Sequence, residues 1–320
     1  MNSEAWRARK VVIVGAGAVG ATFAYALAQS GLSDEIILID HNRDLAQGQV
    51  LDLAHGFPFF PPVEIRAGEA ADFADAQVIV ITAGAKQQPS ESRLDLLQRN
   101  AAIVESIVDD IVSRNSSAVI VVVSNPVDVL THIALKRTEC DRGRVLGSGT
   151  VLDSARFRYL LSQCCGIDVH NVHAYILGEH GDSEFAAWSL THIAGMSINE
   201  YCPVCVKCGD WKAERARMVE EVKSSAYHII DYKGATYFAI GLALVRIVGA
   251  VLRNQKTVLT VSTLLTGEYG VDDVCLSVPA VVSQIGVERV VEGELSVEER
   301  KSLSQSALIL RHTLAKLHSM

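Results

Sequence analysis

Two short segments of this chain contain residue types that could move a proton to or from a small acid. Residues 178–182 read GEHGD and place His180 between two small residues and two acids, while residues 152–156 read LDSAR and contain Asp153 and Arg156. An imidazole titrates near neutral pH, and a neighbouring carboxylate can orient its ring. A guanidinium can hold a carboxylate through two hydrogen bonds. These parts suit the removal of a proton from a hydroxy acid, provided that another group takes the hydride.

A group that takes a hydride is indicated near the start of the chain. The apolar run KVVIV leads into GAGAVG at residues 15–20 and then into an alanine-rich stretch, which predicts a strand, a tight turn and a helix. Gly15 permits the turn, Gly17 lets the backbone approach a pyrophosphate at the helix N-terminus, and Gly20 lets the helix pack on the strand. Asp40 ends the next apolar run, where a carboxylate accepts hydrogen bonds from ribose hydroxyls and repels the 2′-phosphate of NADP. We therefore expect NAD as the cofactor; the alternative is a glycine-rich turn in another α/β protein.

The size and composition are those of an ordinary globular protein with a large core. The chain has 320 residues, of which 49% are hydrophobic and 21% charged, with a formal net charge of −8. Its basic residues are scattered, so no nucleic-acid partner is expected. Residues 7–10, RARK, and the apolar stretch that follows look like a secretory leader, but the glycine pattern inside that stretch favours a structural role. No other stretch is long and apolar enough to span a membrane, and we expect a cytoplasmic protein without a membrane partner.

The first part of the chain alternates predicted strands with predicted helices. Near-continuous apolar strands in such an order indicate a parallel sheet that is covered on both faces. The expected strands are 10–15, 36–40, 63–66, 77–83, 118–124 and 144–147, and the expected helices are 19–30, 43–55, 92–114 and 127–137. A polar turn at 84–92 follows one strand end, at the edge where ligands of such sheets bind.

The pattern changes after residue 148 and indicates a second domain that mixes helices with antiparallel strands. The expected elements are a helix at 153–165, a hairpin-like pair at 172–176 and 188–193, a helical region at 210–253 with a break at 233–234, strands at 258–262, 274–278 and 284–291, and a final helix from 296 to about 318. The residues SVEE at the start of that final helix form a capping box. We therefore expect an α/β protein with one domain at residues 1–148 and an α+β domain at residues 149–320.

The cysteines do not indicate a disulfide framework, because their number, seven, is odd and they are clustered. Cys202, Cys205 and Cys208 have the local spacing of a metal or cluster site, but no fourth ligand is evident near them. We expect reduced thiols and no bound metal, and the role of these three cysteines stays open.

Several motifs, taken in their order, resemble those of the lactate/malate dehydrogenase family. They are residues 15–20, Asp40, AGAKQQP at 83–89, Arg93, SNPVD at 124–128, and the segments 152–156 and 178–182. The match runs nearly from end to end. The resemblance implies an N-terminal Rossmann domain with a doubly wound parallel sheet, a C-terminal α+β substrate domain, and reversible hydride transfer between a 2-hydroxy acid and NAD.

The resemblance implies catalytic roles for four of these residues. His180 is the acid/base, and Asp153 holds its other ring nitrogen and favours the imidazolium form. Arg156, three residues after Asp153 on the same helix face, binds the substrate carboxylate. Arg93 lies on a loop that closes over the substrate, where it polarises the carbonyl that is reduced. The alternatives are a structural histidine, a helix N-cap and two ordinary solvated arginines.

Further family positions line the substrate or the cofactor. Asn125 follows an apolar strand and can hydrogen-bond the substrate or the nicotinamide, Thr236 lines the substrate side chain, and Ile240 forms an apolar wall for the nicotinamide. Gln87 and Asp128 complete the expected substrate group. The expected cofactor group consists of Gly15, Gly17, Val19, Gly20, Asp40, Gly84, Ala85, Val123, Asn125, Ser148 and Ile240.

Gln87 distinguishes between the substrates of the family. Malate dehydrogenases of this family have an arginine there, which pairs with the second carboxylate of oxaloacetate. A neutral glutamine leaves that carboxylate unpaired in a closed site, whereas the methyl group of pyruvate needs no partner. We therefore expect pyruvate and L-lactate as substrates. Because the adjacent Lys86 could supply a charge instead, a malate or other 2-hydroxy-acid dehydrogenase is the alternative, and a non-catalytic NAD-binding regulator is a more distant one.

Arg158 and His173 suggest regulation. Arg158 lies two residues beyond Arg156, which turns it about 200° around a helix. His173 lies seven residues before His180, which puts the two histidines on opposite faces of an extended run. Both residues match positions at which allosteric members of the family bind fructose 1,6-bisphosphate across a subunit interface. We therefore expect this effector and a homotetramer; the alternative is an interface or surface arginine and an ordinary strand histidine.

Overall fold

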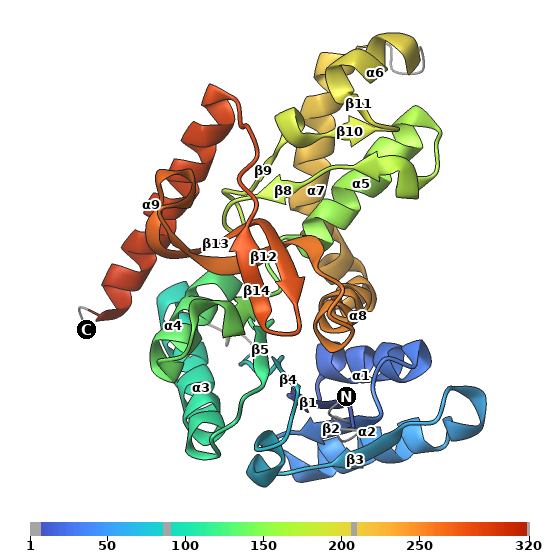
Figure 1. Cartoon of the computed structure of the whole chain (residues 1–320), viewed down its shortest axis with the longest axis vertical. Coiled ribbons are helices and arrows are strands. Elements are labelled where there is room, and N and C mark those ends of the chain that lie inside the picture. The colour runs from blue at the N-terminus through green and yellow to red at the C-terminus, as the bar shows by residue number, and fades with distance from the viewer. Residues whose placement is uncertain (1–7, 86–90, 206–209, 319–320) are drawn as a thin grey trace, which may run out of the picture.

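The computed structural model of the chain describes residues 8–85, 91–205 and 210–318 (Figure 1). In the view of Figure 1, the blue to dark-green part of the chain lies at the bottom and the light-green to yellow part at the top, with orange strands between them. Within these ranges, no helix combines the length and the apolar character that crossing a membrane requires.

A nine-stranded sheet runs through the molecule in the order β14-β13-β12-β6-β5-β4-β1-β2-β3. The six strands expected in the first half are present and pair in parallel: β1 (Lys10–Val14), β2 (Glu35–Ile39), β3 (Glu64–Ala67), β4 (Val78–Ile81), β5 (Val119–Val122) and β6 (Val145–Gly147). The three long strands of the second half are antiparallel, as predicted: β12 (Thr257–Thr266), β13 (Asp272–Ser283) and β14 (Gly286–Val290).

The strands of the second half continue the parallel sheet, a connection that the sequence did not predict. β6 and β12 pair antiparallel, with Gly147 opposite Ser262. A Cβ atom at residue 147 would lie 2.4 Å from Oγ1 of Thr131 and 2.9 Å from Cβ of Ser262. Only a glycine therefore lets the two halves meet this closely.

Apart from α6, which the sequence did not predict, the helices begin and end close to the predicted residues. They are α1 (Ala18–Ser30), α2 (Arg43–Ala54), α3 (Arg93–Ser113), α4 (Val127–Thr138), α5 (Val151–Cys165), α6 (Ile198–Cys205), α7 (Trp211–Lys233), α8 (Phe238–Leu252) and α9 (Val297–His318). The break predicted at 233–234 is the left-handed Gly234 that ends α7. The predicted capping box of α9 is also present, because the amide of Ser296 donates to Glu299 and the amide of Glu299 donates to the hydroxyl of Ser296. Short 3₁₀ turns lie at Phe57–Phe59, Ala70–Phe73, Arg142–Arg144, Val169–Asn171, Trp188–Leu190 and Glu268–Gly270.

Helices cover both faces of the parallel strands because successive strand residues point to opposite sides. Along β1, Val12 belongs to a core shared with α3, α4 and α9, whereas Val11 and Ile13 belong to a core shared with α1, α2 and α8. A third core, which includes Phe157 and Met218, joins α5 and α7 to the short strands of the second half. The carboxyl ends of the parallel strands therefore lie on a rigid support.

The predicted hairpin between 172–176 and 188–193 is divided into two separate pairs. β7 (Val172–His173) pairs with β10 (His192–Ile193), which also pairs with β11 (Met196–Ser197), while β8 (Ile176–Leu177) pairs with β9 (Phe185–Ala186). Gly178 then takes a φ of +102°. The run from 173 to 180 is thus not a single extended strand, and the alternation argument that placed His173 and His180 on opposite faces was wrong in its premise.

Candidate active site

The glycine turn after β1 forms an open helix N-terminus. Gly15 has a φ of +107°, and its amide donates to Ile39. A Cβ atom on Gly20 would lie 1.9 Å from the carbonyl oxygen of Gly15, so this glycine allows α1 to pack on the turn. A Cβ atom on Gly17, the N-cap of α1, would meet nothing within 4 Å. The turn therefore leaves space for a phosphate group beside the positive end of α1.

Asp40 stands beside this turn, after β2. One of its carboxylate oxygens accepts a hydrogen bond of 2.7 Å from the amide of Ala16, and the other accepts one of 2.9 Å from the amide of Asn42. The 98%-exposed side chain of His41 places Nδ1 3.0 Å from the second oxygen and can give way to a ligand, while the first oxygen keeps a further lone pair. The fixed carboxylate can therefore accept from the two hydroxyls of a ribose, and it repels a phosphate on either of them, so the turn and Asp40 together fit NAD.

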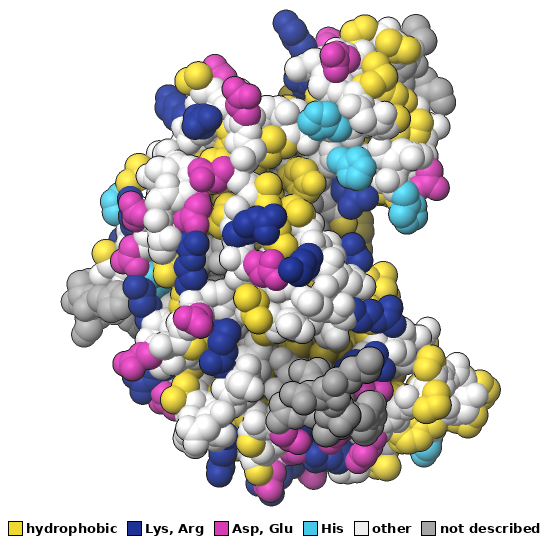
Figure 2. Space-filling model, viewed as in Figure 1, with side chains coloured by type: hydrophobic (Ala, Val, Ile, Leu, Met, Phe, Trp, Pro, Cys, Tyr) yellow, Lys and Arg dark blue, Asp and Glu magenta, His cyan; other side chains and the backbone are white. Residues whose placement is uncertain are grey.

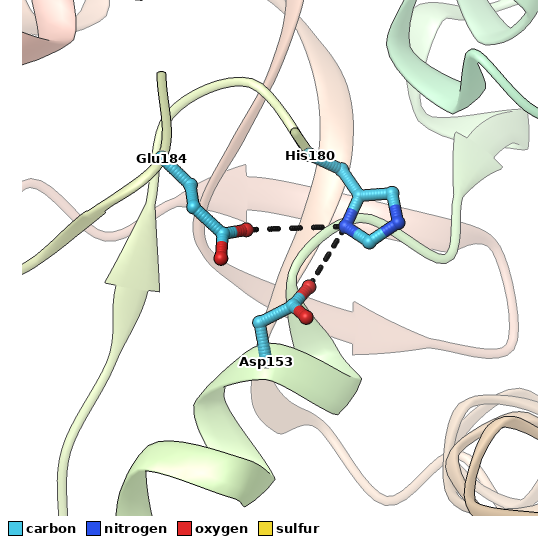
Figure 3. Close-up of side chains that lie close together, drawn as sticks. All are labelled: Asp153, His180 and Glu184. Carbon is cyan, nitrogen blue, oxygen red and sulfur yellow. Dashed lines mark hydrogen bonds and ion pairs between the residues drawn. The ribbon is translucent and has the colours of Figure 1, made fainter. Parts of the chain in front are cut away.

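Asp153, on the first turn of α5, joins the two other side chains that the sequence singled out. Its Oδ2 atom lies 2.8 Å from Nδ1 of His180 (Figure 3). Its Oδ1 atom accepts a hydrogen bond of 2.7 Å from the guanidinium of Arg156. The Asp153 side chain is 2% exposed, whereas that of His180 is 28% exposed. The carboxylate therefore fixes Nδ1 as the inward nitrogen and leaves Nε2 as the nitrogen that can meet a substrate.

The backbone of His180 is held by Asp128, which the sequence placed in the substrate group. Asp128 is buried in α4, and one of its oxygens accepts a hydrogen bond of 2.7 Å from the amide of His180. Its other oxygen accepts a hydrogen bond of 2.6 Å from Ser262 on β12. Asp128 therefore supports the turn that carries the histidine and does not belong to the cavity lining described below.

Glu184 is a buried acid of this site that the sequence analysis did not select. Its Oε2 atom lies 4.0 Å from Nδ1 of His180, and its side chain is 5% exposed (Figure 3). The available signal was its position, because Glu184 stands four residues after the candidate catalytic histidine and directly before the short strand β9. The spacing alone gave no indication of whether the turn folds back toward the histidine.

The charges in this cluster shift its pKa values in opposing directions. Burial by itself would lower the pKa of His180, but the hydrogen bond and the negative charge of Asp153 raise it to about 9. Burial would raise the pKa of Asp153, yet the hydrogen bond from His180 and the charge of Arg156 hold it below its ordinary value. Burial raises the pKa of Asp128 to about 6, against the hydrogen bonds from Ser262 and from the amide of His180. His180 is therefore set to carry a proton at neutral pH.

A cavity of about 650 Å³ brings these groups together with residues from α3, α7 and α9. Asn125, Asp153, Arg156, His180 and Glu184 provide its polar wall. Much of the remaining lining is apolar and includes Leu94, Leu97, Val222, Ala226 and Ile230. A small anion can therefore be bound by Arg156 and meet His180 next to a largely apolar surface.

The loop that the sequence expected to close over a substrate lies only partly within the described chain. Lys86 and Gln87 lie outside the described residues, and so does the side chain of Arg93, the first residue of α3. At the root of the loop, the amide of Ala85 donates to the buried Asn100, whose side-chain nitrogen donates to the carbonyl of Asn125. Asn100, which sequence reasoning missed, thus connects the loop to the end of β5.

The remaining cofactor positions, apart from Ile240 on α8, follow the ends of β1, β4, β5 and β6. Val19, Val123 and Ile240 are partly buried and pack against the same core. Ser148 is buried, with its amide donating to Val122, and Gly84 and Ala85 follow β4. Thr236 lies between α7 and α8 and is not one of the described residues that line the cavity.

Arg158 and His173 lie apart from the cavity lining. A guanidinium nitrogen of Arg158 donates to the carbonyl of Val169 at 3.5 Å, and His173 is exposed on β7, opposite His192 of β10. Histidine side chains gather on this face over the region of α5 and β10 (Figure 2). The two residues that the sequence paired thus belong to adjacent elements, α5 and β7.

The remaining features are a group of possible metal ligands at the site and the cysteines of the second half of the chain. Ligand atoms of Asp153, His180 and Glu184 all lie within 4.8 Å of one another, so these three could in principle surround a cation. The guanidinium beside Asp153 already supplies positive charge there. Cys202 takes part in no disulfide, and Cys208 and the side chain of Cys205 lie outside the described residues. Cys164 is disulfide-bonded, which corrects the expectation that all the thiols are reduced.

Comparisons with known proteins agree over the full length of the chain. Residues 9–147 match the family model "lactate/malate dehydrogenase, NAD binding domain", and residues 150–320 match "lactate/malate dehydrogenase, alpha/beta C-terminal domain". An L-lactate dehydrogenase of Treponema denticola is 57% identical over 310 residues, which cover 97% of this chain and 98% of the relative. One of Thermoanaerobacter pseudethanolicus is 50% identical over 96% of this chain and 99% of its own. The crystal structure of a lactate dehydrogenase from a Medee basin deep-sea metagenome library has a TM-score of 0.95 and 42% identity, covering 98% of this chain and 100% of that one.

Proposed function

The chain belongs to the lactate/malate dehydrogenase family and catalyses the NAD-dependent interconversion of L-lactate and pyruvate, and we propose that His180 exchanges the proton in this reaction. The observation that carries this proposal is the Asp153 carboxylate, which holds Nδ1 of His180 and the guanidinium of Arg156 at the wall of one cavity. Nε2 then faces the reacting oxygen while Arg156 holds the substrate carboxylate.

In pyruvate reduction, His180 gives its proton to the carbonyl oxygen while Asp153 stabilises the imidazolium that precedes this transfer. Arg156 binds the pyruvate carboxylate, and Arg93 polarises the carbonyl when its loop closes. In lactate oxidation, neutral His180 removes the hydroxyl proton. NAD, when bound at Gly15–Gly20 and Asp40, supplies the acceptor or donor of the hydride.

This assignment is tested by NADH oxidation with pyruvate and the variant His180→Ala. We expect turnover to fall by several orders of magnitude while NADH still binds, because the glycine turn and Asp40 do not include the changed side chain. NADH binding is measured separately by fluorescence titration. A His180→Ala protein that oxidises NADH at the wild-type rate would refute the assignment.

Substrate choice is proposed to depend on Gln87. Oxaloacetate would bring a second carboxylate to a neutral amide, and an unpaired carboxylate in a closed site is unfavourable. We expect Gln87→Arg to shift the ratio of kcat/KM for oxaloacetate and pyruvate toward oxaloacetate by at least about tenfold, or about 1.4 kcal/mol. An unchanged ratio would contradict the role of Gln87.

We propose residues 1–148 as the domain that binds the nucleotide and residues 149–320 as the domain that binds the substrate. The boundary lies between β6 and α5, immediately after the glycine that contacts β12. Ser148 and Asp153 then belong to different domains although they are close in sequence. Limited proteolysis tests the proposal. The protease should not cut between Ser148 and Asp153, because this segment directly follows β6, which is held within the sheet.

We further propose that Arg158 and His173 bind fructose 1,6-bisphosphate. Nε of Arg158 is buried without a hydrogen-bond partner within the described chain, and His173 is exposed on an adjacent element. An anion at this position would meet an arginine and two facing histidines, His173 and His192. The test is a pyruvate saturation curve with and without the bisphosphate at several pH values, and curves that coincide at every pH would exclude this effector.

A homotetramer is the proposed assembly. Large apolar side chains are exposed on α1, α2, α7 and α8 and on the turn after α2, with Phe59 88% and Tyr232 87% exposed. Such exposure is typical of surfaces that another subunit covers. Light scattering during size-exclusion chromatography should give four times the 34.6 kDa chain mass, with the bisphosphate present if it bridges subunits.

We also propose a cytoplasmic location, since the reaction draws on the intracellular NADH pool; cell fractionation tests this.

A further inference from the structure

We propose that Glu184 is a second proton-holding group of the site, which is neutral in the resting enzyme and whose ionisation extends the pH range over which His180 keeps its proton. The proposal rests on the assignment of His180 as the acid/base. Glu184 does not touch the reacting atoms. It acts through its charge, which changes the pKa of His180, and is therefore a positioning residue.

The geometry places two acids around one imidazole nitrogen. Asp153 approaches Nδ1 of His180 from α5 at 2.8 Å, and Glu184 approaches the same nitrogen from the segment before β9 at 4.0 Å (Figure 3). The side chains of the two acids are 2% and 5% exposed. At these distances both carboxyl groups interact directly with the charge of the imidazolium.

The two acids are not equivalent, because among the described residues only Asp153 has compensating partners on both oxygens. His180 and Arg156 each approach one oxygen of Asp153, which stabilises the carboxylate. Glu184 has the longer 4.0 Å ion pair with His180 and lies next to the negative charge of Asp153. Burial beside an existing anion favours the neutral form of a carboxyl group. Of the two acids, Glu184 is therefore the one that holds a proton.

Other charged groups face this cluster from every element around it. They are Arg156 on α5, Asp128 on α4, Lys223 on α7, Lys316 on α9, and Glu179 and Asp182 on the turn of His180. Lys223 donates to the carbonyl of Asp182, and one oxygen of Asp128 is bound to the amide of His180. Burial, followed by the charge of Asp153, raises the pKa of Glu184 to about 8, although the charges of His180, Arg156 and Lys223 lower it.

This arrangement has a consequence for the acid/base chemistry. Below about pH 8 Glu184 is neutral, and Asp153 alone stabilises the imidazolium. Above this pH, Glu184 loses its proton and places a second negative charge 4.0 Å from Nδ1, which opposes the loss of the proton from His180. The enzyme thereby keeps His180 protonated, and pyruvate reducible, at a higher pH than Asp153 alone would allow.

The test compares wild type with Glu184→Gln, Glu184→Asp and the control Glu221→Gln by the pH dependence of kcat/KM for pyruvate at saturating NADH. Glu221 is a 43%-exposed acid on α7 that forms an ion pair with Arg217, so its change removes one charge without altering the cluster. We expect the apparent pKa of Glu184→Gln to fall by about one unit, since an opposite charge within about 4–6 Å shifts a pKa by roughly 1–3 units and Glu184 is ionised over only part of the range. Glu184→Asp should restore most of the wild-type value, and Glu221→Gln should equal it.

A second measurement does not require the variant to be active. Infrared difference spectra of wild type against Glu184→Gln at neutral pH should contain a protonated-carboxyl band that disappears on alkaline titration, and NADH binding with thermal unfolding confirms that each variant is folded. The proposal is overturned if Glu184→Gln has the wild-type pH profile, or if no protonated carboxyl is present at neutral pH. Full activity in His180→Ala would instead refute the acid/base assignment, so the two failures are distinguishable.

Discussion

The backbone amide of His180 donates a 2.7 Å hydrogen bond to the carboxylate of Asp128, 52 residues earlier in the chain. Asp128 is fixed in turn by Ser262, so α4 and β12 jointly hold the turn that carries the histidine. Asp153 holds the ring of the same residue from α5. His180 is thus anchored by two separate carboxylates, one at its backbone and one at its side chain.

The first prediction concerns the backbone anchor. In Asp128→Asn, an amide group replaces one of the two accepting oxygens, so either the His180 amide or Ser262 loses its acceptor. We expect kcat/KM for pyruvate to fall by about tenfold, since a buried hydrogen bond to a charged group contributes roughly 1.5–3 kcal/mol and part of this loss is relieved by movement. The apparent pKa of His180 should change little, because Asp153 remains. Steady-state kinetics at several pH values measures both quantities, and a large shift of the pH profile would contradict a purely structural role for Asp128.

The second prediction concerns the pH dependence that Asp153 creates. The pKa of His180 is raised to about 9, so its proton, and with it pyruvate reduction, should persist to about pH 9 and decline above it. Lactate oxidation, which needs the neutral ring, should rise through the same range. In Asp153→Asn both transitions should move toward the ordinary histidine value near 6.5 and the rate should drop by roughly two to four orders of magnitude. Initial rates in both directions between pH 5 and 10 test this; unchanged transitions in the variant would contradict it.

The third prediction separates carboxylate binding from chemistry. Arg156→Lys keeps the positive charge but loses the planar pair of donors that can hold both Asp153 and a substrate carboxylate. We expect KM for pyruvate to rise by about 100-fold, equivalent to about 2.7 kcal/mol, with NADH affinity unchanged. The matched control is Arg137→Lys, which alters an exposed arginine paired with Asp109. Equal KM values for the two variants would show that Arg156 does not bind the substrate.

The fourth prediction distinguishes two glycines of one turn. In Gly20→Ala, the new methyl group would lie 1.9 Å from the carbonyl oxygen of Gly15, so the free energy of unfolding should fall by about 1–3 kcal/mol or more. In Gly17→Ala, the methyl group meets no protein atom within 4 Å, so the stability should be preserved. It would instead occupy the space beside the N-terminus of α1, and NADH should bind about tenfold more weakly. Urea unfolding and fluorescence titration measure the two effects, and the opposite assignment of effects would contradict the cofactor site.

Local patterns in the sequence were sufficient for the parallel strands, their helices and the cofactor turn. Each depends on neighbouring residues, such as the apolar run before Gly15 or the capping box at Ser296 and Glu299, whose effect on the backbone is local. The chemical roles of His180, Asp153 and Arg156 could also be predicted, because residue type and spacing indicate which group can exchange a proton and which can supply a charge. The family resemblance added roles that spacing alone does not supply.

Only the tertiary structure determined how these parts meet. The approach of Glu184 to His180 depends on how the turn between them folds, and the bond from the His180 amide to Asp128 joins that turn to α4. The junction of β6 with β12 depends on the space at Gly147. These contacts join residues that are distant along the chain or separated by a change of direction, and their energies come from burial and from long-range packing. The sequence by itself therefore determined which chemistry was available, and the packing of α4, α5 and β12 around one turn determined how strongly the histidine holds its proton.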